Sequence, residues 1–147
     1  MPIRLALFDF DGTLADSFAA IAASVNHVRL GYGLAPLTEV EVRSYVGFGL
    51  DKLMDELCPG FPVAESVRKY REHHPSVMLT KTRLFPGVQE TLFELHSRGT
   101  RLGVCSNKAV SFTRTLVSGL GLGTLFADVL GPEDVGGKAK PDPAMLL

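Results

Sequence analysis

Cysteine is scarce in this sequence, which has only Cys58 and Cys105 in 147 residues. The two lie far apart and match no metal-binding spacing, which excludes a cysteine-based metal site. A reducing, cytoplasmic setting is the simpler interpretation, with both thiols as small residues of the core.

Strong charge and long apolar runs are also missing. The formal net charge is -1, so no overall field favours nucleic acid or an anionic membrane as a partner. No apolar run approaches the roughly 18 residues that a membrane-spanning helix needs. The first residues show no order typical of a secretory signal. Hydrophobic residues at 46% and charged residues at 21% instead indicate a soluble globular protein that acts on small molecules.

The apolar residues alternate between strand-like and helix-like patterns along the chain. Short apolar runs at residues 3–8, 101–105 and within 125–130 predict three strands. Apolar stripes at helical spacing separate these runs, at residues 18–28, 88–95 and 109–120. This alternation implies a parallel sheet with right-handed crossovers and its three strands adjacent in the order first, second, third. The predicted fold is therefore α/β, with a Rossmann-like parallel sheet core.

Residues 15–86 do not fit a simple crossover, because they far exceed the usual loop length. They carry helical stripes of their own, with Thr38 and Glu41 spaced as a capping box and Pro75 placed to break the last helix. We interpret this segment as a small α-helical cap domain. It is inserted into an α/β core domain made of residues 1–14 and 87–147.

Three polar clusters fall at strand ends or in loops that can reach them: Asp9/Asp11, Ser106-Asn107 and Lys138/Lys140. Ligands of open parallel sheets bind outside the carboxyl ends of the strands. The topology therefore predicts one site formed by these clusters.

Asp9 and Asp11 are two residues apart, and two such carboxylates repel each other by up to ~4 kcal/mol at a few ångströms. A hard cation with oxygen ligands relieves that repulsion, and Mg²⁺ is the natural choice. Gly12 allows a tight turn, so that the following amides, including that of Thr13, can point at phosphate oxygens. An aspartate nucleophile forms an acyl-phosphate. A simple turn after the strand, or a metal site without nucleophilic chemistry, are the alternatives.

The motifs resemble those of one family. The run DFDGTLADS at residues 9–17 resembles the first motif of the haloacid dehalogenase superfamily in its phosphatase form. Residues 106–108, SNK, resemble the second motif, and Lys140 in the run KPDP resembles the third. The inserted helical segment is similar to the family's small cap. The resemblance extends over essentially the whole chain.

This resemblance implies a role for each residue. Asp9 would be the nucleophile, and Asp11 the general acid and base that phosphatases and phosphomutases keep at this position. Ser106 and Asn107 would bind the substrate, and Lys140 would offset charge around the nucleophile. The Asp9 carboxylate and the Asp11 main-chain carbonyl would hold Mg²⁺. The implied enzyme is a Mg²⁺-dependent phosphatase that hydrolyses the phosphate monoester of a small metabolite through an aspartyl-phosphate.

Two further motifs resemble segments that are linked to substrate choice in the family. Gly47 and Gly49, in the run YVGFGL, resemble the substrate-specificity loop of phosphoglycolate-phosphatase-type members. The run LFPGV at residues 84–88 resembles their second hinge. 2-Phosphoglycolate is the best single candidate. A β-phosphoglucomutase-like phosphotransferase is the alternative.

The family's fourth motif, an acidic loop after a fourth strand beside the first, has no counterpart here. The C-terminal strands of the sheet would be missing, and the first strand would be an exposed edge. We favour a fragment of a longer phosphatase. The alternative is a short, catalytically impaired homologue with a binding role that restores the edge by dimerisation or strand exchange. Monomer and homodimer both stay open.

Other polar residues have simpler interpretations. Lys108 is expected at the surface, and Ser106 could cap the helix that follows it. The four histidines show no ligand spacing and are interpreted as structural or surface residues. Arg43 could reach a substrate carboxylate, although a surface arginine on a helix is the commoner case.

Overall fold

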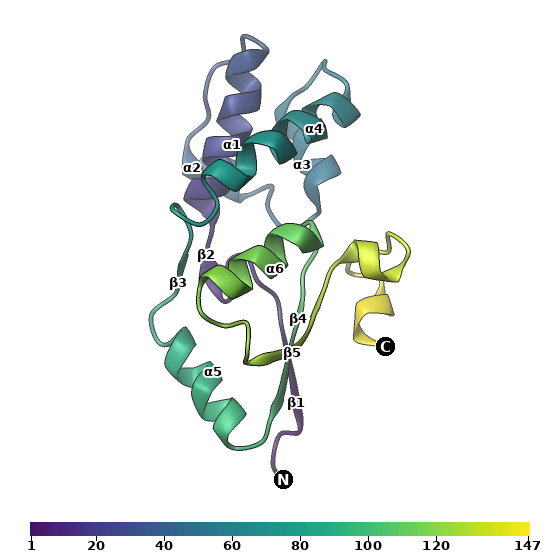
Figure 1. Ribbon diagram of the computed structural model, residues 1–147. Coiled ribbons are helices and arrows are strands. Elements are labelled where there is room, and N and C mark those ends of the chain that lie inside the picture. The colour runs from purple at the N-terminus through teal and green to yellow at the C-terminus, as the bar shows by residue number, and fades with distance from the viewer. The chain divides into compact units, whose positions relative to one another are not determined.

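The computed structural model describes residues 1–147, which form two compact units (Figure 1). The first consists of Met1–Asp16 and Arg83–Leu147, and the second of Ser17–Thr82. Each unit has its own buried apolar core. None of the helices combines the length and apolarity that spanning a bilayer requires.

The first unit is built on a three-stranded parallel sheet. Its strands are β1 (Leu5–Phe8), β4 (Arg101–Cys105) and β5 (Phe126–Leu130), in the order β1-β4-β5. The α/β fold and the strand order predicted from the sequence are confirmed. All three carboxyl ends therefore lie at one edge of the sheet.

Two helices cover one face of this sheet. α5 (Val88–Ser97) precedes β4, and α6 (Val110–Gly119) joins β4 to β5. Both crossovers move across the sheet in the same direction, so right-handed connections place both helices on one face. Leu102 and Val104 are buried in the core of this unit together with Leu116 of α6. Each such side chain contributes about 1.5–3 kcal/mol by leaving water.

The sequence gives no sign of a second, two-stranded sheet. β2 (Ala15–Asp16) pairs antiparallel with β3 (Arg83–Leu84), just where the chain leaves and re-enters the first unit. Strands of two residues are too short to show a period. The segment after β5, expected to be a loop, also contains two short 3₁₀ turns, η2 (Pro132–Val135) and η3 (Pro143–Leu146).

The second unit is entirely helical. It contains α1 (Phe18–Gly31), α2 (Glu39–Arg43), α3 (Leu50–Leu57), α4 (Val63–His73) and the 3₁₀ turn η1 (His74–Ser76). The expected capping box of α2 is present. Thr38 Oγ1 accepts from the Glu41 N–H at 3.2 Å, and Glu41 Oε2 accepts from the Thr38 N–H at 2.7 Å. α4 ends just before Pro75, as predicted.

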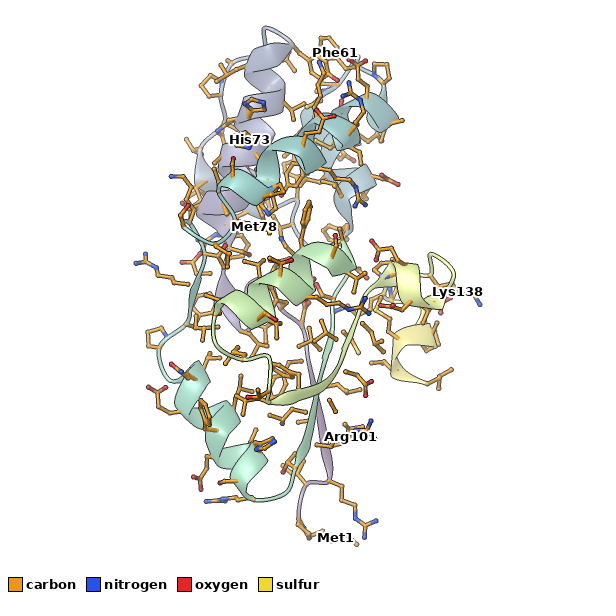
Figure 2. All side chains as sticks on the ribbon, in the orientation of Figure 1. Met1, Phe61, His73, Met78, Arg101 and Lys138 are labelled. Carbon is orange, nitrogen blue, oxygen red and sulfur yellow. The ribbon has the colours of Figure 1, made fainter.

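A polar cluster lies between α1 and the end of α4, where Figure 2 labels His73. The Ser24 hydroxyl is 2.8 Å from His74 Nδ1 and 3.1 Å from His73 Nδ1. The rings of His27 and His73 stack with their centroids 4.0 Å apart. Burial, and to a smaller extent the neighbouring His27, lower the pKa of His73.

Candidate active site

The turn after β1 is organised around one buried carbonyl. The Phe10 carbonyl accepts from the N–H groups of Thr13, Leu14 and Ala15 at 3.2, 3.0 and 3.1 Å. Phe10 itself is fully buried, and Gly12 takes a φ of 78°, a conformation that glycine adopts without steric cost. The buried Phe10 thus anchors the turn that carries Asp9 and Asp11.

Each of the two carboxylates has a lysine partner from a different part of the chain. Lys140 Nζ lies 3.3 Å from Asp9 Oδ1, and Lys108 Nζ lies 3.4 Å from Asp11 Oδ1. The Asp9 side chain is 42% exposed, whereas those of Asp11 and Lys108 are only 10% and 7% exposed. Asp9 therefore faces solvent, while Asp11 and Lys108 form an enclosed ion pair. The formal charges of these four side chains sum to zero.

The expectation that Lys108 lies at the surface is wrong. Its side chain turns inward because the Asp11 carboxylate offers an opposite charge where the solvent is largely excluded. One signal in the sequence could have revealed this. Lys108 is the third residue after the second strand, at the sheet edge where two carboxylates already require cations.

Ser106 and Asn107 are buried at the carboxyl end of β4. The Ser106 hydroxyl accepts from the Lys108 N–H at 3.1 Å and so braces the turn. It does not cap α6. There, the Val110 N–H donates to the Glu133 carboxylate, at 3.3 Å from both oxygens.

Asn107 binds the backbone of Lys140 with both ends of its amide. Its Nδ2 donates to the Lys140 carbonyl at 3.0 Å, and its Oδ1 accepts from the Lys140 N–H at 2.7 Å. The two residues are 33 apart in sequence. The contact joins the turn after β4 to the loop that carries the lysine of Asp9.

The loop that carries Lys140 has further polar contacts to α6. The Arg114 guanidinium binds the Asp134 carboxylate at 2.9 Å. Asp134 also accepts from the Gly131 N–H at 2.9 Å, and this hydrogen bond is the main reason why the pKa of Asp134 is lowered. The ion pair between Arg114 and Asp134 thus holds the loop to α6.

The residues that the sequence singled out fall into both units. Asp9, Asp11, Ser106, Asn107 and Lys140 lie in the first unit, as do Gly12 and Thr13. Gly47 and Gly49 belong to the second unit, in the segment between α2 and α3. Both take positive φ values, 113° and 92°, which favour glycine. Arg43, also in the second unit, stacks on the Phe18 ring at 4.4 Å and pairs with Glu39.

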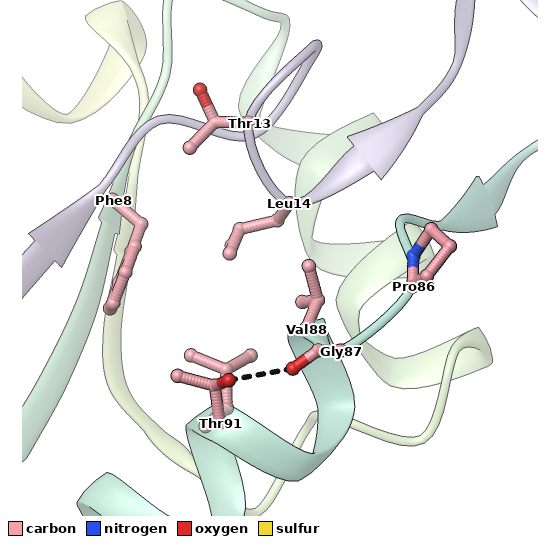
Figure 3. Close-up of a pocket in the computed structure, with 8 residues that line it drawn as sticks. Phe8, Thr13, Leu14, Pro86, Gly87, Val88 and Thr91 are labelled. Atoms are coloured by element: carbon pink, nitrogen blue, oxygen red, sulfur yellow. Dashed lines mark hydrogen bonds between the residues drawn. The ribbon is translucent and has the colours of Figure 1, made fainter.

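A mostly apolar cavity of about 270 Å³ lies beside the turn that follows β1 (Figure 3). Phe8, Leu14 and Val88 line it, and Thr91 Oγ1 donates to the Gly87 carbonyl at its wall. No charged side chain lines this cavity. It is therefore distinct from the cluster of carboxylates and lysines.

The chain contains no group of three or more His, Cys, Asp or Glu side chains that could hold a metal ion. Asp9 and Asp11 are the two acidic side chains of the cluster, and their donor atoms are all oxygens. Such a set fits Mg²⁺, which keeps several water ligands and needs only one or two carboxylates from the protein.

Comparison with known proteins agrees with this arrangement. Residues 6–147 match the model of the haloacid dehalogenase-like hydrolase family. A phosphoglycolate phosphatase of Cereibacter sphaeroides is 33% identical over an alignment that covers 95% of this chain and 67% of the relative. The corresponding enzyme of Vibrio cholerae is 32% identical, with 98% and 68% covered.

Solved structures give the same result. A predicted phosphoglycolate phosphatase from Haemophilus somnus superposes with a TM-score of 0.89 at 26% identity, covering 99% of this chain and 69% of that one. The match to the family model extends over nearly all of the residues, including Asp9, Asp11, Ser106 and Lys140. The chain belongs to the haloacid dehalogenase-like hydrolase family.

Proposed function

We propose that this chain is built for the Mg²⁺-dependent hydrolysis of small phosphate monoesters through an aspartyl-phosphate on Asp9. One observation carries the proposal. Two carboxylates stand at the carboxyl end of β1, one exposed and one enclosed, and each has its own lysine. This asymmetry suits two different roles in one reaction.

Asp9 has the features of a nucleophile. Its Oδ1 accepts from the Phe10 N–H at 2.8 Å and contacts Lys140 Nζ at 3.3 Å, which fixes the carboxylate and leaves Oδ2 for attack. As the bond from Oδ2 to phosphorus forms, the bond from phosphorus to the leaving oxygen breaks. Asp11, which must take up a proton and give up its ion pair with Lys108 before this step, gives that proton to the leaving oxygen. A water molecule then attacks phosphorus, Asp11 takes a proton from it, and phosphate and free Asp9 are released.

The charge balance of the site supports a divalent cation. The four side chains are neutral in sum, whereas a phosphate group brings a charge of about −1.5 to −2 at neutral pH. The Asp9 carboxylate and the Asp11 main-chain carbonyl would hold Mg²⁺, whose charge offsets that of the incoming phosphate. Lys140 then stabilises the remaining negative charge beside Asp9.

Other proposed contacts complete the binding of the substrate. The Ser106 hydroxyl and the amides of Gly12 and Thr13 are the proposed ligands of the phosphate oxygens. Gly47 and Gly49 are proposed substrate contacts on the strength of the sequence resemblance alone. A cytoplasmic setting is part of the proposal, supported by the two buried free thiols.

The relatives favour 2-phosphoglycolate as the first substrate to test, since several of them are named phosphoglycolate phosphatase. The chain spans about two thirds of their length, 67% for the Cereibacter sphaeroides enzyme. We therefore propose, for this shorter chain, the activity that the names of those longer proteins state.

The test is turnover of 2-phosphoglycolate and p-nitrophenyl phosphate with MgCl₂, and again with EDTA. We expect Mg²⁺-dependent release of phosphate, and a loss of at least about 10³-fold in kcat for Asp9→Asn because the nucleophile is removed. Lys138→Ala, an exposed lysine in the loop of Lys140, is the matched control and should leave turnover unchanged. An absence of turnover with inorganic phosphate still bound would contradict the proposal and indicate a binding role.

A further inference from the structure

Lys140 lies in a loop that polar contacts hold to the rest of the first unit. Lys138 lies in the same loop (Figure 2) and is exposed to solvent, which makes it the natural reference residue. A lysine side chain is a flexible four-carbon stem that ends in a point charge, so its reach alone does not fix the position of the ammonium. The place of the Lys140 backbone must be set by another group.

We propose that Asn107 is a positioning residue, which holds the Lys140 backbone against the end of β4 and so keeps the ammonium beside Asp9. The proposal rests on the function above for its effect on catalysis, but not for the contact itself. It assigns Asn107 a different role from the substrate contact that the sequence resemblance implied.

The geometry of the contact is specific to an amide. The Asn107 side chain has an amide N–H that donates to the Lys140 carbonyl at 3.0 Å, and an amide oxygen that accepts from the Lys140 N–H at 2.7 Å. These two hydrogen bonds fix both the distance of the Lys140 backbone from the Asn107 side chain and its orientation, as the two hydrogen bonds of a residue pair between antiparallel strands do. Aspartate would set a carboxylate against the Lys140 carbonyl, and alanine would remove both bonds. Neither can replace asparagine.

The residues on either side of Asn107 also contribute to the arrangement of the site. Ser106 braces the turn, Asn107 holds Lys140, and Lys108 pairs with Asp11. The three consecutive residues after β4 therefore supply one lysine of the site, Lys108, and hold the backbone of the other, Lys140. A displacement of about 1 Å at a reacting group costs roughly 10²-fold in rate, so an anchor of the Lys140 backbone bears on catalysis through the position of the Lys140 ammonium.

The first experiment needs no turnover. Folded chains of wild type, Asn107→Ala and Asn107→Asp are treated with a limiting amine-acetylating reagent, and the labelling rate of each lysine is measured by mass spectrometry. We expect Lys140 to be labelled several-fold faster in both variants, with Lys138 unchanged as the internal reference. An equal Lys140 rate in all three proteins would overturn the proposal. A rise at Lys69 as well would reveal general unfolding, because its ammonium pairs with Glu65 and lies over the Tyr32 ring in the folded chain. Asn107→Gln, which keeps both polar groups, would then decide. A Lys140 rate close to that of wild type in this variant supports the anchor, and a rate as high as in Asn107→Ala overturns it.

The second experiment separates positioning from substrate binding. The value of kcat/KM for p-nitrophenyl phosphate is measured for Asn107→Ala, Lys140→Ala and the double variant. If Asn107 acts through Lys140, the double variant matches Lys140→Ala alone. Additive losses would mean that Asn107 binds substrate directly, which would overturn the proposal. If wild type shows no turnover, the proposed function fails, while the labelling result still decides the role of Asn107.

Discussion

Asp11 and Lys108 form the most enclosed ion pair of the chain, with 10% and 7% of their side chains exposed. Removal of one partner leaves the other charge poorly solvated, which costs more than the pair itself contributes. We therefore expect Lys108→Met to lower the free energy of unfolding by about 3 kcal/mol. Chemical denaturation measures this change.

A second variant tests the cause of that loss. Adding Asp11→Asn to Lys108→Met removes the enclosed negative charge that Lys108 offsets, so we expect much of the stability to return. Lys138→Met, at an exposed site, should change the free energy of unfolding by less than about 0.5 kcal/mol. If the double variant were less stable than Lys108→Met, the ion pair could not be the reason for the effect.

Single residues also show how far the sequence could predict this site. Asp9, Asp11, Ser106 and Lys140 are predicted to share one site because they follow strands whose carboxyl ends meet, or lie in loops that reach this edge, and the structure brings Lys140 to Asp9. The partners of Lys108 and Asn107 could not be assigned. Which carboxylate or backbone group each one meets depends on the path of a loop more than 30 residues further on, or on a turn nearly 100 residues earlier.

At the scale of elements, the loop that follows β5 approaches the turn after β4 very closely at Gly131. A Cβ atom there would lie 2.7 Å from Val110 Cβ and 3.2 Å from the Lys108 carbonyl oxygen. Because these neighbours belong to a helix start and a backbone, they cannot easily move. We expect Gly131→Ala to lower the free energy of unfolding by about 1–3 kcal/mol and to reduce phosphatase turnover.

Gly103→Ala is the matched control for this substitution. A Cβ atom at Gly103, within β4, would lie 2.8 Å from Leu7 Cδ2, the end of a flexible and partly exposed side chain. That group can move aside, so we expect a loss below about 1 kcal/mol. Equal losses for the two variants, measured by denaturation, would contradict the close approach of the loop.

The packing of α1 against the end of α4 predicts a pH dependence. Burial beside His27 holds the pKa of His73 below its ordinary value of 6.5. The unfolded chain therefore binds more protons than the folded chain as the pH falls through this value, and stability falls with it. We expect wild type to lose more free energy of unfolding than His73→Gln between about pH 7.5 and 5.5. His96→Gln, at an exposed position, should follow wild type, and parallel curves for all three proteins would contradict the prediction.

Elements were predictable where they are long enough to show a period. The strand at residues 101–105 and the capping box at Thr38 were found because local residues determine them. The β2–β3 ribbon, η2 and η3 have two to four residues each, too few for a pattern.

For the molecule as a whole, the two outer strands of the main sheet differ in their protection. On β5, the Arg114 guanidinium donates to the Val129 carbonyl at 3.3 and 3.1 Å and so covers part of that edge. β1 forms the opposite edge, and its Leu5 and Leu7 are 53% and 41% exposed. An apolar strand edge of this kind is a template for pairing with another chain.

We therefore expect the protein to associate reversibly as its concentration rises, with β1 at the contact. Leu7→Lys places a charge on the edge strand and should shift the weight-average mass towards the monomer in sedimentation or light-scattering measurements. Leu79→Lys is the matched control, because Leu79 is also 41% exposed but lies in the helical unit. Apolar exposure alone would make the two variants equally effective. Only the unpaired backbone of an edge strand gives Leu7→Lys the larger effect, so equal shifts, or no association in wild type, would exclude β1 as the contact.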